Sequence, residues 1–245
     1  MTLPRRPLGT TGIEVSVLGL GTVKLGRDQG VKYPAGFKIP DDRAASALIA
    51  QATELGINLI DTAPAYGTSE ARLGKLLAGQ RERWVICSKV GEEFVDGQSR
   101  FDFSAAHTRR SVERSLRRLR TDFLDIVLVH SDGNDLAVID DSGALEALTR
   151  LREEGLVRAI GVSTKTVEGG LRAAALSDCV MVTYHLGYEA ERPVLDYCAA
   201  NGKGALIKKA LASGHLAVSG QDPVRASLEL VLGHPGVSSA IVGTI

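Results

Sequence analysis

The chain has few cysteines and no clustered metal-binding residues, and this shortage excludes several classes of small protein. Its 245 residues include three cysteines, Cys87, Cys179 and Cys198, with no CxxC pair among them. Disulfide frameworks and zinc ribbons need more cysteines at closer spacing. The histidines outside the candidate site described below show no metal-ligand spacing with cysteines or carboxylates. We therefore expect no disulfide framework and no metal site.

Net charge and long hydrophobic runs are also missing. Lysine and arginine together number 29, as do aspartate and glutamate, so the formal net charge is zero. A protein that holds nucleic acid or an anionic membrane usually carries a strong positive charge. No apolar run approaches the roughly 20 residues of a membrane span, and the first residues lack the apolar core of a signal peptide. We expect a cytoplasmic protein without nucleic-acid or membrane partners, and the oligomeric state stays open.

What the chain does contain is a regular alternation of short apolar runs with longer amphipathic segments. The runs are nearly continuous rather than alternating, which is typical of strands in a buried parallel sheet. They cover residues 17–22, 57–63, 84–90, 124–131, 157–164, 179–187, 204–211 and 238–245. The segments between them carry apolar residues at helical spacing, for example Ala45, Ile49 and Ala52 before Gly56.

Eight strands, each after the first preceded by a helix, predict an α/β fold of the (β/α)8 TIM-barrel type. Residues 1–245 are expected to form this one barrel domain, because no linker divides the chain. A doubly wound open sheet is the alternative, although it rarely needs eight regular repeats. Residues 6–16 read as a hairpin around a Thr–Gly turn, and we expect this hairpin to plug one end of the barrel.

Two long irregular stretches, 24–42 and 91–103, follow the first and third predicted strands. Aromatic residues make up only 4% of the chain, yet Tyr33, Phe37, Phe94, Phe101 and Phe103 all fall in these stretches. Barrel enzymes build their sites from the loops at the carboxyl ends of the strands. We therefore expect these loops to contact a substrate.

Four polar residues lie at or just beyond the ends of consecutive predicted strands. Asp61 ends the second strand, Tyr66 follows in its loop, Lys89 ends the third and His130 ends the fourth. Each alone has a structural interpretation, as a turn residue, a rim aromatic, a strand-end lysine or a packed histidine. Together they converge on one mouth of the barrel, which favours a catalytic site.

The chemistry that suits these four residues is proton transfer from a phenol. A free tyrosine has a pKa near 10. A nearby ammonium favours the phenolate, so we expect Lys89 to lower the pKa of Tyr66 while Asp61 keeps the lysine charged and oriented. A histidine can donate a hydrogen bond to a substrate oxygen. Because the set lacks a nucleophile, we expect a nicotinamide cofactor to supply a hydride to a carbonyl substrate.

The motifs LIDTAPAYG, SKVG, LVHS, IGVS and the closing IVGT occur in the order and strand positions found in the aldo-keto reductase family. The chain resembles that family over nearly its whole length, from GLGT at 19–22 onward. The resemblance implies reduction of an aldehyde or ketone to an alcohol, or the reverse reaction, with NADPH as the usual cofactor and NADH not excluded. It makes Tyr66 the proton donor, Lys89 and Asp61 its tuning pair, and His130 the residue that orients the carbonyl.

The resemblance also implies cofactor contacts around the barrel mouth. In the family, the serine that matches Ser163 holds the nicotinamide carboxamide. The other candidates are Gly21, Thr22, Asp61, Thr164, Met181, Lys209, Ala210, Leu211, Ser213, Gly214, Gly243 and Thr244. Three of them depart from the family pattern: Thr164 replaces an asparagine, Met181 a glutamine, and Lys209 an aromatic residue that stacks on the nicotinamide ring. Lys209 is expected to face a phosphate or the carboxamide instead.

Two other functions stay open at this point. A nicotinamide-binding regulatory subunit with slow or no turnover is one, because the usual carboxamide contacts are substituted. An aldolase-like barrel that uses Lys89 to form a Schiff base is the other, although the expected Asp61 partner would keep that lysine charged.

The last predicted strand ends at Ile245, so the helix expected after it is absent from the sequence. In the family that segment carries the basic residues that grip the adenosine 2′-phosphate of NADPH. We expect the natural chain to continue beyond this point.

Overall fold

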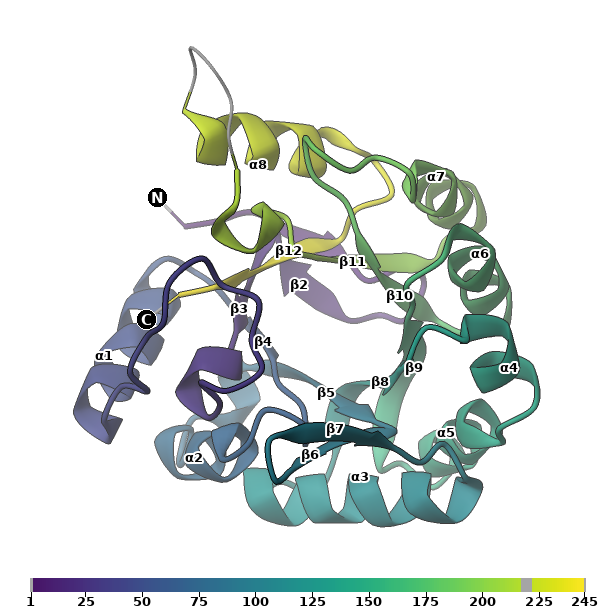
Figure 1. Cartoon of the computed structure of the whole chain (residues 1–245), viewed down its shortest axis with the longest axis horizontal. Helices are drawn as coiled ribbons and strands as arrows, with labels where there is room; N and C mark the ends of the chain where they lie inside the picture. Colours follow the sequence, from purple (N-terminus) through teal and green to yellow (C-terminus); the bar gives the residue numbers. More distant parts are fainter. Residues whose placement is uncertain (1, 217–221, 245) are drawn as a thin grey trace.

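The computed structural model describes residues 2–216 and 222–244, and its centre is a closed parallel barrel. Within these residues eight strands close the ring in the order β10-β11-β12-β3-β4-β5-β8-β9 (Figure 1). They are β3 (Leu18–Gly21), β4 (Leu59–Asp61), β5 (Val85–Val90), β8 (Leu124–His130), β9 (Val157–Ser163), β10 (Cys179–Thr183), β11 (Gly204–Lys208) and β12 (Ser239–Gly243). All eight runs predicted from the sequence are present, so the barrel prediction is confirmed and the open sheet is excluded.

Helices surround the barrel on its outside, as Figure 1 shows. Those of the described residues are α1 (Asp42–Glu54), α2 (Ser69–Leu76), α3 (Ala105–Leu119), α4 (Asp135–Asp140), α5 (Ala144–Glu153), α6 (Val167–Leu176), α7 (Arg192–Asn201) and α8 (Pro223–Gly233). Short 3-10 turns lie at η1 (Val23–Leu25), η2 (Arg81–Arg83) and η3 (Ala212–Gly214). None of the described helices is both long and apolar enough to cross a membrane.

Capping residues mark the ends of the helices. The carboxylate of Asp41 accepts a hydrogen bond from the Ala44 amide at 2.8 Å and caps α1, and Gly56 follows that helix with a φ of 83°. At α3 the Ser104 hydroxyl accepts from the His107 amide at 3.2 Å. Side-chain oxygens thus satisfy amides that have no partner inside the helix.

Two layers of apolar side chains hold the fold together. One lies between the strands and the surrounding helices and includes Ile60, Leu73 and Val112. The other fills the barrel interior and includes Leu59, Leu128 and Met181. Successive strand residues point to opposite faces, so Leu59 packs inside the barrel and Ile60 packs outside it.

A hairpin closes the end of the barrel where the strands begin. Its strands, β1 (Arg5–Pro7) and β2 (Glu14–Ser16), pair antiparallel, and Leu8 and Ile13 between them belong to the interior cluster. Leu8 is completely buried and packs so closely on Gly204 that no Cβ would fit there. The predicted plug is therefore confirmed.

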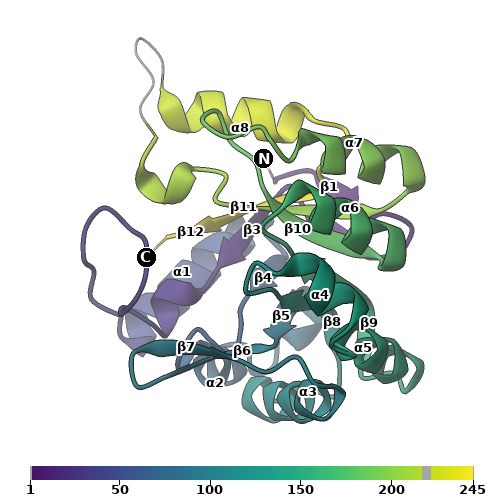
Figure 2. The ribbon, with the colours of Figure 1, turned by 45° about the vertical axis from the view of Figure 1, so that its right-hand side comes forward.

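The stretch 91–103 is more ordered than the sequence suggested. It contains a second antiparallel hairpin, β6 (Glu92–Val95) and β7 (Gln98–Phe101), joined by Asp96 and Gly97. Both turn residues have positive φ values, 53° and 76°, as a type I′ turn requires. Figure 2 shows this hairpin on the same side of the barrel as the long loop between η1 and α1.

The predicted runs extend past the strands, most clearly the second, sixth and seventh. The second shrinks to Leu59–Asp61 and the sixth stops at Thr183. The seventh ends at Lys208, because Lys209 has a φ of 56°, which no strand residue adopts. Ile245, the last residue of the eighth predicted run, lies outside the described residues. In the described part of the chain no helix follows β12.

The Leu8 plug allows a direct test of what closes the barrel. Leu8→Ala removes a fully buried side chain from the interior cluster, so we expect the free energy of unfolding to fall by about 2–5 kcal/mol. Urea denaturation followed by circular dichroism measures the loss. Leu55→Ala is the matched control, because Leu55 is 48% exposed, and its effect should be about 0.5 kcal/mol or less. Equal effects of the two substitutions would contradict the plug.

Candidate active site

The carboxyl ends of β4, β5 and β8 bring the four predicted catalytic residues to one cavity. Asp61, Tyr66, Lys89 and His130 all line a cavity of about 720 Å³ at the barrel mouth. Parallel strands in a closed ring present their ends to the same side, so residues far apart in the sequence meet there. The predicted convergence of these side chains is therefore found.

Tyr66 is placed by a tight turn between β4 and α2. Its amide donates to the Ala63 carbonyl at 3.0 Å, and its own carbonyl accepts from the Ser69 amide at 3.2 Å. Gly26 packs directly on this turn, where a Cβ would collide with the backbone of Tyr66 and Ser69. The turn thus fixes the peptide that carries the phenol.

Lys89 and Asp61 form a buried ion pair beneath the phenol. The Lys89 Nζ donates to Asp61 Oδ1 at 2.5 Å and to the Thr62 carbonyl at 2.9 Å. The side chains are only 2% and 5% exposed. Burial disfavours the charged lysine, but Asp61 together with Tyr66 and Cys87 outweighs this, so the pKa of Lys89 lies above its ordinary value. Lys89 is therefore a fixed ammonium, 4.8 Å from the Tyr66 ring centroid.

The pKa of Tyr66 shifts in the direction opposite to the prediction. Burial raises the phenol pKa, Lys89 lowers it, Asp61 raises it, and the net result lies above the ordinary value of 10. The expected effect of Lys89 is present, but the net lowering predicted from the sequence is wrong. The sequence could not give the burial of the phenol, which is the larger effect. At neutral pH Tyr66 is protonated.

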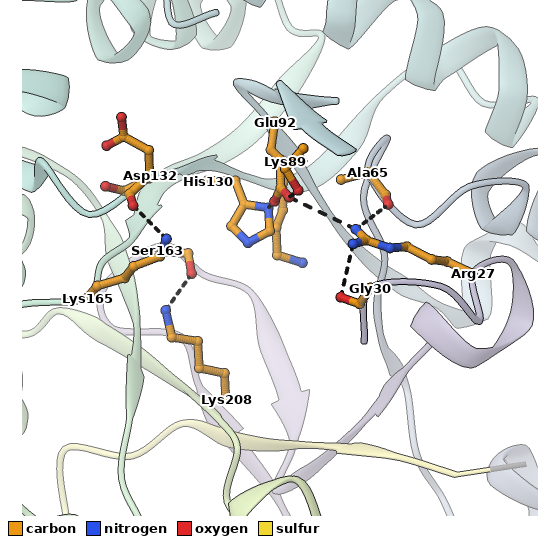
Figure 3. A network of polar contacts seen from close by, with 12 residues as sticks. Arg27, Gly30, Ala65, Lys89, Glu92, His130, Asp132, Ser163, Lys165 and Lys208 are labelled. Carbon is orange, nitrogen blue, oxygen red and sulfur yellow. Dashed lines mark hydrogen bonds and ion pairs between the residues drawn. The ribbon is translucent and has the colours of Figure 1, made fainter. Parts of the chain in front are cut away.

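His130 ends β8 and contacts a carboxylate that the sequence analysis did not identify. Its Nδ1 lies 2.7 Å from Glu92 Oε2, and the two side chains are 21% and 12% exposed. The contact is off the ideal direction of a ring N–H, so it is a close approach of the ring nitrogen to the carboxylate rather than a linear hydrogen bond. Figure 3 shows Glu92 directly beside the His130 ring.

Most of the predicted cofactor residues line the same cavity. These are Gly21, Thr22, Asp61, Ser163, Met181, Lys209, Ala210, Leu211, Ser213, Gly214 and Gly243. Thr164 and Thr244 are not part of the lining. The Thr164 hydroxyl is buried near Gly170 of α6, on the outside of the barrel, because successive residues at the end of β9 face opposite ways.

Lys208 and Lys209 both line the cavity, but Lys208 is the lysine that contacts Ser163. Its Nζ donates to Ser163 Oγ at 3.0 Å and to the Thr164 carbonyl at 2.5 Å, as Figure 3 shows for the serine. Burial lowers the pKa of Lys208 to about 8. Lys209 is exposed at the rim. The sequence analysis missed Lys208 because it placed the end of β11 three residues too late.

Two loops supply further residues that the sequence analysis missed. Arg27, from the loop after η1, donates to the carbonyls of Ala65 and Gly30 at 3.1 and 3.2 Å. Its guanidinium lies 3.4 Å from the centroid of the Phe94 ring, so it joins this loop to the β6–β7 hairpin. The Asp–Gly pair flanked by alternating residues was the sequence signal for that hairpin.

The aromatic residues of these loops divide into two groups. Tyr33 and Phe37 line the cavity, with rings 5.6 Å apart. Phe94, Phe101 and Phe103 do not line it, and Phe101 stacks on Phe103 instead. Of these two loops, the one between η1 and α1 presents its aromatic rings to the cavity and the β6–β7 hairpin does not.

A comparison with models of protein families shows which family the chain matches. The model of the aldo/keto reductase family matches residues 17–231. Among characterised proteins, the chain is 33% identical over 216 residues to aldo-keto reductase YhdN of Bacillus subtilis, which covers 85% of this chain and 62% of that protein. It is 32% identical over 232 residues to L-galactose dehydrogenase of Arabidopsis thaliana, covering 88% and 67%. The chain thus spans about two thirds of the length of these relatives.

Solved structures agree with this assignment. A Pseudomonas aeruginosa protein described as a candidate aldo-keto reductase is 64% identical, with a TM-score of 0.90, and the match covers 98% of this chain and 88% of that one. The holo form of a Bacillus halodurans aldo-keto reductase is 25% identical, with a TM-score of 0.82, covering 99% and 86%. The chain belongs to the aldo/keto reductase family of oxidoreductases.

Proposed function

We propose that the protein reduces an aldehyde or ketone to an alcohol with NADPH, or catalyses the reverse reaction. The observation that carries this proposal is the protonated Tyr66 held over the buried Lys89–Asp61 pair in the barrel-mouth cavity. A phenol in that setting delivers a proton to an oxygen that gains negative charge. Hydride supplied by a bound nicotinamide creates such an oxygen when it adds to a carbonyl carbon.

The residues of the cavity suit a nicotinamide carboxamide. Ser163 Oγ and Lys208 Nζ lie 3.0 Å apart on one wall. A carboxamide both donates and accepts hydrogen bonds, and this pair offers a hydroxyl that accepts and an ammonium that donates. Thr164 faces outward and Met181 has no amide, so we assign the carboxamide to Ser163 and Lys208.

The rim of the cavity suits phosphate groups. Burial lowers the pKa of Lys209, and the like charges of Lys32 and Lys165 lower it further. Lysines that repel one another in this way gain when an anion binds between them. Ser213 and Gly214, which line the same side, add a polar turn.

The catalytic steps assigned to this chain are orientation and proton transfer. His130 holds the carbonyl oxygen, and Tyr66 transfers its phenolic proton to that oxygen as the alcohol forms. The Lys89 ammonium stabilises the resulting phenolate, and Asp61 keeps the ammonium in place. Solvent then returns a proton to Tyr66.

The geometry disfavours the Schiff-base alternative. An amine attacks a carbonyl only when neutral, but Lys89 is paired with Asp61 at 2.5 Å and its pKa is raised.

Tyr66→Phe tests the proton donor. We expect the turnover of aldehyde reduction to fall by about 10²–10⁴-fold, because the ring stays and the proton is lost. Binding of NADPH, measured by fluorescence titration, should survive. Tyr197→Phe on α7 is the control and should leave both quantities unchanged. Retained turnover in Tyr66→Phe would overturn the assigned mechanism.

Asp61→Asn tests the ion pair. The substitution leaves Lys89 buried without a carboxylate, so we expect the free energy of unfolding to fall by about 3–5 kcal/mol. Guanidinium denaturation gives the value. Glu229→Gln, which breaks the exposed pair with Arg225, is the control and should leave the denaturation midpoint unchanged. An equally small effect of Asp61→Asn would show that the buried pair adds nothing.

Cofactor choice is tested by titration. Binding is followed by quenching of Trp84 fluorescence or by enhancement of dinucleotide fluorescence. We expect a lower dissociation constant for NADPH than for NADH. Raising the salt concentration should weaken NADPH binding more, because it carries one more phosphate. Tighter binding of NADH would contradict the proposed preference.

A further inference from the structure

Glu92 is the residue whose position the assigned mechanism does not yet explain. It begins β6 immediately after β5, lines the cavity and faces His130. The hairpin to which it belongs carries it across the barrel mouth, where Figure 3 places it between His130 and Arg27.

The Glu92 carboxylate is held from one side and presents its other oxygen to His130. Its Oε1 accepts from Ser99 Oγ of β7 at 2.6 Å and lies 4.0 Å from Arg27 Nη1. Its Oε2 lies 2.7 Å from His130 Nδ1. The direction of the carboxylate is therefore fixed by groups that do not touch His130.

Glu92 is ionised throughout the physiological pH range. Burial opposes its charge, but contact with His130, Ser99 and Arg27 lowers its pKa to about 2. Arg27 is itself fixed by the carbonyls of Ala65 and Gly30. A carboxylate, not a carboxylic acid, thus faces the histidine.

This contact determines where His130 carries its proton. A ring nitrogen 2.7 Å from a carboxylate oxygen must hold a proton, because two lone pairs at that distance repel each other. With the proton on Nδ1, the neutral ring has a lone pair on Nε2. Figure 3 shows this second nitrogen turned away from Glu92, toward the space between Lys89 and Lys208.

We propose that Glu92 is a positioning residue that pins the proton of His130 on Nδ1, so that Nε2 donates a hydrogen bond to a carbonyl oxygen only in the imidazolium form. The neutral ring instead accepts a hydrogen bond at Nε2 from the hydroxyl of an alcohol. This inference rests on the proposed carbonyl chemistry. It adds that the protonation state of His130 separates reduction from oxidation.

The groups around His130 determine the pH at which its imidazolium loses a proton, and they place it on the acidic side of neutrality. Burial lowers the pKa of His130, Glu92 raises it, and the ammonium groups of Lys89 and Lys208 lower it. The net pKa lies below 6.5. The kcat/KM for reduction should therefore fall as the pH rises through this pKa, and that for oxidation should rise.

The proton position can be measured directly by 15N NMR of the histidine side chains in the cofactor-free protein. The chain has five histidines, and His130→Gln identifies the signals of interest. Above its pKa, His130 should show a protonated Nδ1 and a bare Nε2. A neutral ring protonated on Nε2 would overturn the proposal, whether or not the protein reduces carbonyls.

The second test compares Glu92→Gln with Glu93→Gln. Loss of the Glu92 charge should lower the His130 pKa by about one unit or more and move the alkaline limb of the reduction profile to lower pH by the same amount. Glu93 lies on the same strand but pairs with Arg114 of α3, so its substitution should move neither. If both variants leave the His130 pKa unchanged, Glu92 does not act on His130.

Glu92→Leu is a further variant, needed because the glutamine amide of Glu92→Gln can still accept a hydrogen bond from His130. Leucine places no carboxylate beside Nδ1, so the proton of the neutral ring should be shared between Nδ1 and Nε2, and reduction should become less dependent on pH. An NMR shift without any turnover in the wild-type protein would reject the carbonyl chemistry and keep the Glu92–His130 pair. Normal carbonyl reduction by the wild-type protein, with the alkaline limb of its pH profile unchanged in Glu92→Gln, would reject the role of Glu92 and leave the proposed carbonyl chemistry intact.

Discussion

The buried pair of Lys89 and Asp61 is the interaction on which the site depends. The two residues end adjacent strands, and their 2.5 Å contact lies almost out of reach of solvent. An ammonium in that place would be unstable alone. The carboxylate keeps it charged, and the charge in turn offsets part of the burial that raises the pKa of Tyr66. The parallel pairing of β4 and β5 makes the arrangement possible, because it brings the carboxyl ends of these two strands to the same side of the sheet.

A second contact, between the Glu92 carboxylate and the His130 ring, lies on the other side of the cavity. In the proposed mechanism, the Lys89–Asp61 pair acts on the group that gives the proton, and the Glu92–His130 contact acts on the group that holds the oxygen. In the first pair, Lys89 near the end of β5 contacts Asp61 at the end of β4. In the second, His130 at the end of β8 contacts Glu92 of the β6–β7 hairpin. In this account the barrel strands position the groups that transfer the proton, and the β6–β7 hairpin, through Glu92, determines which nitrogen of His130 carries a proton.

The sequence predicted the barrel well, because continuous apolar runs and helical spacing report burial directly. It also located Tyr66 and Lys89, since strand-end residues of a barrel share one mouth. It failed where the result depends on exact backbone conformation. The choice between Lys208 and Lys209 depends on one left-handed residue. The carboxylate of Glu92 is held beside His130 by Ser99, which faces it because the chain turns back at Asp96 and Gly97. The net pKa of Tyr66 was equally out of reach, because burial is a property of the folded chain.

We propose that the cavity at the barrel mouth converts carbonyl substrates rather than only holding a cofactor. The most direct measurement is single-turnover oxidation of NADPH bound to the protein, followed by stopped-flow fluorescence with a panel of aldehydes and ketones. The account predicts rapid oxidation by at least one of them, with one alcohol formed per bound NADPH. Tight NADPH binding with no oxidation by any member of the panel would contradict it and favour a regulatory nicotinamide-binding subunit.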